Sequence, residues 1–177
     1  MRHVVPGKSS IAWFKLAEFV SRGEKERALG LHRLLLHSFD DYAVGCQLAG
    51  DILMAFNETE AIEKYKEAGD LYKKNGRIRE AIGIYEQLTL LCPQNKEFLS
   101  QLFEFYLSTD NTRKAAHTIH RLISLLLDAN DHEGVIEQIR AHTVAIDTQC
   151  RSELIGLLRT VHQNCDACER IIGGELF

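Results

Sequence analysis

Short breaks divide nearly the whole chain into helix-length amphipathic runs, and this pattern limits the folds that the chain can adopt. The breaks lie at Gly23 and at the segments SFDD, NET, KNG, CPQN, TDN, AND and DTQ, whose residues favour turns and helix ends. They predict about nine helices, at residues 9–22, 24–37, 40–56, 58–75, 77–91, 95–108, 111–128, 131–146 and 149–172. Ser9 or Ser10 is the expected N-cap of the first. Because the breaks are short, neighbouring helices should fold back on each other as antiparallel hairpins.

The composition favours an all-α protein. Leu, Ala, Glu, Lys, Arg and Gln, which lose little rotamer freedom in a helix, dominate the 177 residues, and only two prolines occur. A net charge of −4 gives no general attraction to nucleic acid or anionic membranes. No apolar run reaches the roughly 18 residues of a membrane span, and the N-terminus lacks the apolar region of a secretory signal. We therefore expect a cytoplasmic protein whose five cysteines are reduced.

Small residues recur along the helices at a nearly constant spacing. Ala28 and Ala61 are 33 residues apart, and Ala81 and Ala115 are 34 residues apart. A helix-turn-helix pattern of this period resembles the tetratricopeptide repeat (TPR). Its clearest copy consists of Tyr65, Ala68, Gly69, Tyr72, Ala81, Tyr85 and Pro93. Weaker copies contain Trp13, Leu16, Ala17, Val20, Ala28 and His32; Cys46, Ala49, Gly50, Leu53, Ala61 and Tyr65; and Leu99, Leu102, Phe103, Tyr106, Ala115 and Ile119.

The resemblance implies a right-handed solenoid of antiparallel helix pairs over residues 10–128. An N-terminal arm at 1–9, a C-terminal helical pair or cap at 129–172 and a tail at 173–177 would complete the chain. Phe103 departs from the small residue that the repeat has at this position. Ala61 and Ala81 are only 20 residues apart, so helix 58–75 would have to close one pair and open the next. We expect a half-repeat there, unless the early pairs have simply diverged.

A TPR-like stack implies a non-enzymatic protein–protein interaction module, an adaptor or assembly scaffold that binds a partner segment in its concave groove. The residue after each small position is acidic at four places, which favours a basic partner, although a solvated helix face would look similar. Glu18 can reach Arg22, and Asp70 can reach Lys66 or Lys73, at helical spacing. The candidate partner-binding residues are Glu18, Gln47, Asp51, Lys66, Asp70, Ser100 and Glu104. Of these residues, the six other than Glu18 occupy the positions of the carboxylate clamp in some TPR cochaperones; only one is basic and none is Asn, so such a clamp is not expected.

Two alternatives stay open. The run from Ala61 to Leu88 is also similar to the helical repeats of soluble NSF attachment proteins, which implies a vesicle-trafficking adaptor. Cys165 and Cys168 could bind zinc or cycle as a dithiol, but they lie on an apolar stripe where cysteine behaves as a small hydrophobe. The same stripe could pair the last helix with that of a second copy. We predict no catalytic residue, metal or cofactor, because His117 and His120 lack an acidic orienter and no Gly-rich phosphate loop follows a strand.

Overall fold

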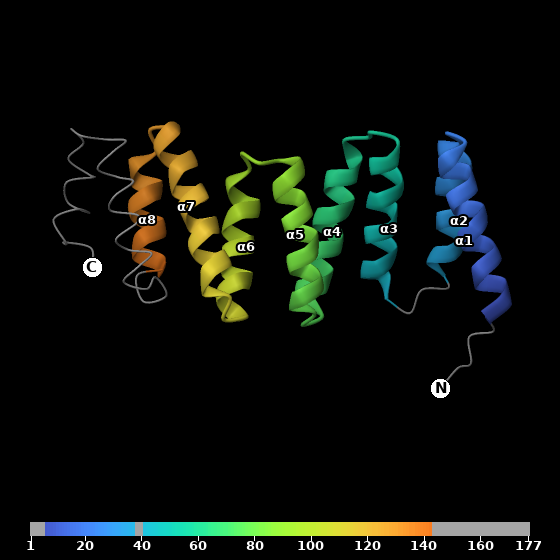
Figure 1. Cartoon of the computed structure of the whole chain (residues 1–177), viewed down its shortest axis with the longest axis horizontal. Coiled ribbons are helices and arrows are strands. Elements are labelled where there is room, and N and C mark those ends of the chain that lie inside the picture. Colours follow the sequence, from blue (N-terminus) through green and yellow to red (C-terminus); the bar gives the residue numbers. More distant parts are fainter. Residues whose placement is uncertain (1–5, 38–40, 143–177) are drawn as a thin grey trace. The chain divides into compact units, whose positions relative to one another are not determined.

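The computed structural model describes residues 6–37 and 41–142, and every regular element within them is a helix (Figure 1). Within this part of the chain, the prediction of an all-α fold is confirmed. The expected ninth helix, 149–172, lies outside the described residues. The helices are α1 (Pro6–Ser21), α2 (Lys25–Leu36), α3 (Tyr42–Ala55), α4 (Glu60–Lys74), α5 (Ile78–Leu91), α6 (Lys96–Ser108), α7 (Thr112–Asp128) and α8 (His132–His142).

Side-chain caps account for several of the helix starts. The Asp41 carboxylate accepts a hydrogen bond from the Ala43 amide at 2.9 Å, and Asn95 accepts one from the Phe98 amide at 3.1 Å. Each cap satisfies an amide that has no partner inside its own helix. The first helix differs from the prediction, because it begins at Pro6 and not after Ser9 or Ser10. Proline is favoured at the first helical position, where its missing N–H costs nothing.

The chain divides into two compact units, residues 1–91 and residues 92–177. In the first unit, α1, α2 and α3 share a small core around Leu16, Ala28 and Ile52. The first helix fits the repeat pattern poorly, since Trp13 is 42% exposed and Ala17 is exposed as well. The prediction that these two residues form a packed repeat position is therefore wrong.

Helix α4 packs between α3 and α5, and each contact is built on a glycine that faces a tyrosine. A Cβ atom at Gly50 of α3 would lie 2.8 Å from the Tyr65 ring of α4. A Cβ atom at Gly69 of α4 would lie 2.7 Å from the Tyr85 ring of α5. Both distances are shorter than real Cβ contacts, so only glycine lets these helices approach so closely. Both halves of α4 contact α3, because the Tyr72 hydroxyl in its second half donates a hydrogen bond to Gln47 of α3. The half-repeat at this helix stays a prediction.

The second unit contains α6, α7 and α8. Phe103 takes the place of the small residue in the repeat pattern, and it is nevertheless fully buried, with Leu99, Ile119, Ile123 and Leu127 among the other fully buried side chains. The contact between α6 and α7 is therefore built largely from aliphatic and aromatic residues, and neither of these two helices contains a glycine.

Ion pairs join the N-terminal ends of next-but-one helices in both units. The paired residues are separated by 33, 36 and 35 positions, close to one repeat length. Within each unit, the joined helices therefore start at the same end. These contacts are partly exposed, so they fix register more than they add stability. The pairs are Lys25–Glu58, Asp41–Arg77 and Lys96–Asp131.

Candidate partner-binding surfaces

Two of the predicted carboxylates are held in place by tyrosines of the following helix. The Tyr65 hydroxyl donates a hydrogen bond to Asp51 Oδ1 at 2.8 Å, and the Tyr85 hydroxyl donates one to Asp70 Oδ1 at 2.7 Å. Both aspartates are exposed, whereas both tyrosine rings are buried. Each tyrosine therefore links a core contact to a surface charge, because the same ring also covers the glycine that precedes the aspartate.

The tyrosine hydroxyls stay protonated and act as donors. Burial raises the pKa of Tyr65, and the hydrogen bond to the Asp51 carboxylate raises it further. Burial also raises the pKa of Tyr72, whose hydroxyl donates to Gln47 Oε1 at 2.8 Å. Near neutral pH, Asp51 and Gln47 therefore each accept a hydrogen bond from α4.

The structure brings together four of the seven predicted residues on two helices that pack directly against each other. Gln47 and Asp51 belong to α3, and Lys66 and Asp70 belong to α4. Glu18 of α1 pairs with Arg22 at 2.6 Å, as its spacing predicts. Ser100 and Glu104 belong to the second unit, where Gln101 Nε2 donates to Glu104 Oε2 at 3.0 Å.

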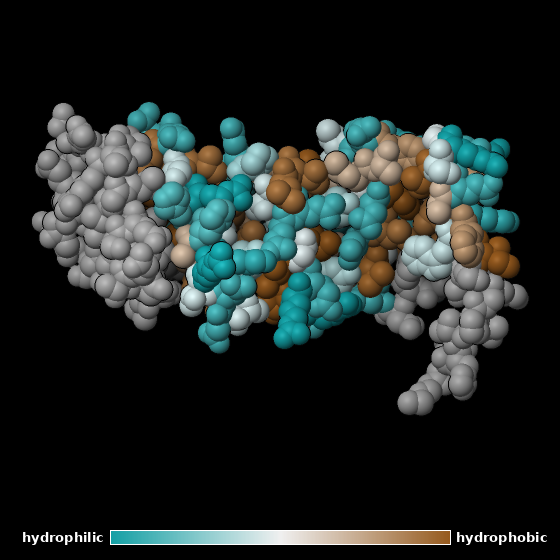
Figure 2. Space-filling view, viewed as in Figure 1, coloured by the Kyte–Doolittle hydropathy of each residue, from teal (hydrophilic) through white to brown (hydrophobic). Residues whose placement is uncertain are grey.

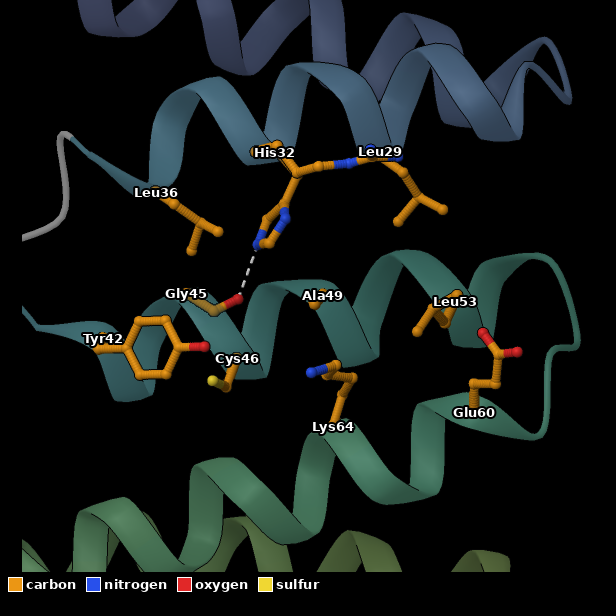
Figure 3. Close-up of a pocket in the computed structure, with 11 residues that line it drawn as sticks. Leu29, His32, Leu36, Tyr42, Gly45, Cys46, Ala49, Leu53, Glu60 and Lys64 are labelled. Atoms are coloured by element: carbon orange, nitrogen blue, oxygen red, sulfur yellow. Dashed lines mark hydrogen bonds between the residues drawn. The ribbon is translucent and has the colours of Figure 1, made fainter.

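A cleft that sequence reasoning missed lies between α2, α3 and α4 (Figure 3). Its volume is about 270 Å³. Leu29 and Leu36 line it from α2, whereas Ala49 and Leu53 line it from α3. The space-filling view shows hydrophobic residues gathered over α2 and α3 (Figure 2). Figure 3 shows Lys64 of α4 on the opposite side of the cleft from α2.

A buried histidine joins two walls of the cleft, α2 and α3. His32 points from α2 towards α3, and its Nε2 lies 2.8 Å from the Gly45 carbonyl oxygen, which fixes Nε2 as the donor (Figure 3). On the other wall, the Lys64 ammonium donates to Glu67 Oε2 at 2.8 Å. The small residues Gly45, Cys46 and Ala49 are the sequence signal that could have indicated this cleft. Whether small residues leave a cleft depends on how α2 packs against α3, which the sequence pattern does not show.

Cys46 lies at one end of the cleft, and its surroundings favour the neutral thiol over the thiolate. Burial, the larger cause, and the nearby Glu67 carboxylate together raise the pKa of Cys46 to about 11. We expect alkylation of Cys46 by iodoacetamide at pH 8 to be roughly 100-fold slower than that of the half-buried Cys92, because the thiolate is the nucleophile. Peptide mapping by mass spectrometry would measure both rates. The rates should converge in guanidinium chloride, and equal rates in the folded protein would contradict the assignment.

Among the residues that the structure describes, no three His, Cys, Asp or Glu side chains come together as a metal site. Cys165 and Cys168 lie outside this part, so the zinc and dithiol alternative stays a prediction. The same holds for pairing through helix 149–172. Within the described ranges, no helix has the length and apolar character needed to cross a bilayer.

No family model matches the chain. It is similar to a protein of Drosophila melanogaster described as "BBSome complex member BBS4 homolog", with 29% identity over 72 residues. The similarity covers 41% of this chain and 15% of the fly protein, so the chain matches only a small part of that relative's length.

Proposed function

We propose that this chain is a non-enzymatic protein-interaction module, an adaptor or scaffold within a multi-protein assembly. The observation that carries the proposal is the pair of exposed aspartates, Asp51 and Asp70, each oriented by a tyrosine from the next helix. Two further facts support it. The described residues form successive helices, which is compatible with a TPR-like repeat, and the similar fly protein is itself described as a member of a complex.

In this proposal, a partner segment lies along the surface that carries Gln47, Asp51, Lys66 and Asp70, and presents Lys or Arg to the two carboxylates. In each aspartate, Oδ1 accepts the tyrosine hydrogen bond and Oδ2 can accept another from the partner. Because the carboxylates are already ordered, binding does not have to immobilise them, which lowers the entropic cost of association. The net charge of −4 would speed the encounter with a basic segment.

A random peptide library displayed on phage tests this proposal, because it samples a large number of partner sequences at once. We expect peptides enriched on the immobilised full chain to contain Lys or Arg. Replacing both aspartates by asparagine, D51N together with D70N, should weaken their binding by about tenfold at low ionic strength and by less at high salt. Asparagine retains an oxygen that can accept the tyrosine hydrogen bond, so this variant removes charge with little change in packing.

The matched control is the double variant E63Q with E26Q, which removes two exposed acids outside the candidate set. It should leave the Kd of the selected peptides nearly unchanged. If both double variants weakened peptide binding equally, the loss would be due to net charge alone, which would contradict a defined binding site. A library that yields no binding peptide would contradict the interaction role itself.

A further inference from the structure

We propose that the cleft between α2, α3 and α4 is an anchor pocket for a partner peptide that presents a bulky apolar side chain close to an acidic residue, whose carboxylate pairs with Arg33. This inference rests on the proposed function in assuming a peptide partner. It names a different surface and the opposite partner charge, so it can fail separately.

The shape and lining of the cleft select the size and polarity of its occupant. Its volume of about 270 Å³ is close to the lower end of typical ligand pockets, which begin at about 300 Å³. That space suits one or two large side chains and is too small for a whole helix. Leu29, Leu36 and Leu53 line it, so an aliphatic or aromatic side chain would replace water held against an apolar surface.

The cleft is formed by the fold of the chain itself. Its floor consists of small residues of α3, Gly45 and Ala49, which lie one helical turn apart. The hydrogen bond from His32 to the Gly45 carbonyl fixes the distance between α2 and α3 at one end of the cleft. A partner side chain can therefore enter without the helices having to separate first, and such preorganisation favours binding.

The charged residues that line the cleft from α4 already interact with other charged residues of the chain, whereas, among the described residues, the arginine that lines it from α2 does not. Lys64 is paired with Glu67, and Glu60 lies close enough to Lys25 to help raise the pKa of that lysine. Arg33 is exposed, and within the described part of the chain it forms no ion pair or hydrogen bond. It is the lining cation that remains open to a partner. A guanidinium group binds a carboxylate through two parallel hydrogen bonds, which favours Asp or Glu in the partner.

The probe is the phage-displayed library of random 12-residue peptides, selected on the full chain, with synthetic copies measured by fluorescence anisotropy. We expect one group of peptides with Leu, Ile, Met, Phe or Trp within about four residues of Asp or Glu, matching one helical turn or a short extended stretch. R33E should weaken their binding by about tenfold or more, because it replaces an attraction by a repulsion. A49L should have a similar effect by filling the floor of the cleft.

Two controls make the test specific. R79E introduces the same charge change at an exposed position of α5 that does not line the cleft, and it should change the Kd by less than about twofold. Replacing the acidic residue of the peptide by Lys should restore binding to R33E. Because Arg33 is exposed, its substitution should leave the thermal unfolding midpoint nearly unchanged.

The outcomes separate the two proposals. If every selected peptide lost affinity for the D51N/D70N variant but bound R33E and A49L as well as the wild type, the anchor pocket would be overturned and the proposed function would stand. Equal weakening by R33E and R79E would also overturn it. A library without any binding peptide would overturn both.

Discussion

Replacing Tyr65 by Ala should lower the free energy of unfolding of the first unit by about 3–5 kcal/mol, the usual cost of truncating a buried aromatic side chain. Tyr65 is 1% exposed, its ring covers Gly50, and its hydroxyl holds Asp51. Truncation would remove the ring that packs between α3 and α4 and leave a cavity there. Denaturation in urea, followed by far-ultraviolet circular dichroism, would measure the change.

Tyr65→Phe is the matched control, since it keeps the ring and removes only the hydroxyl. We expect it to cost about 1 kcal/mol, the typical net contribution of one hydrogen bond. If the two variants were equally destabilised, the ring would not fill the α3–α4 contact as described.

Substitution of alanine for glycine should lower the stability of the protein at Gly50 and Gly69 but raise it at Gly30 and Gly83. At Gly50 and Gly69, the new Cβ would lie 2.8 Å and 2.7 Å from a buried tyrosine ring, which cannot move freely. We expect each substitution to destabilise by about 1–3 kcal/mol through overpacking, less the gain in helix propensity. At Gly30 and Gly83, a Cβ would meet nothing within 4 Å, so alanine should stabilise by up to about 1 kcal/mol.

Thermal unfolding midpoints of the four single variants would test this contrast. The comparison controls for helix propensity, because all four glycines lie within helices. If alanine at position 30 or 83 destabilised the protein as much as alanine at position 69, the close approach of the helices would not explain why position 69 is a glycine.

The helices and their small contact positions could be predicted from the sequence because both depend on local pattern. The alanines that set the repeat spacing are all buried, at 2% exposure or less, and the break segments within the described residues coincide with the helix ends to within a few residues. Capping residues such as Asn95 and Asp41 act within three positions of themselves, so their effect can be inferred from sequence.

The candidate surfaces could be predicted only in part, because they depend on how one helix is rotated and offset against the next. The acidic positions were found by spacing, but the tyrosines that orient Asp51 and Asp70 come from 14 and 15 residues further along. The cleft depends on His32 occupying a position that Tyr or Phe fills in the repeat pattern, and on its bond to a backbone carbonyl. Trp13 matches the residue type of the repeat pattern, but its side chain is 42% exposed, so residue type alone did not predict its burial.

The ion pairs between next-but-one helices also bear on how the protein acquires its structure during synthesis. Each joins residues 33–36 positions apart, so the chain segment closed by each contact is short. Closing short segments costs little entropy, and chains dominated by such contacts fold rapidly. A helix emerging from the ribosome would meet its packing neighbours soon after its own synthesis, and would expose its apolar face only briefly to aggregation or to proteases.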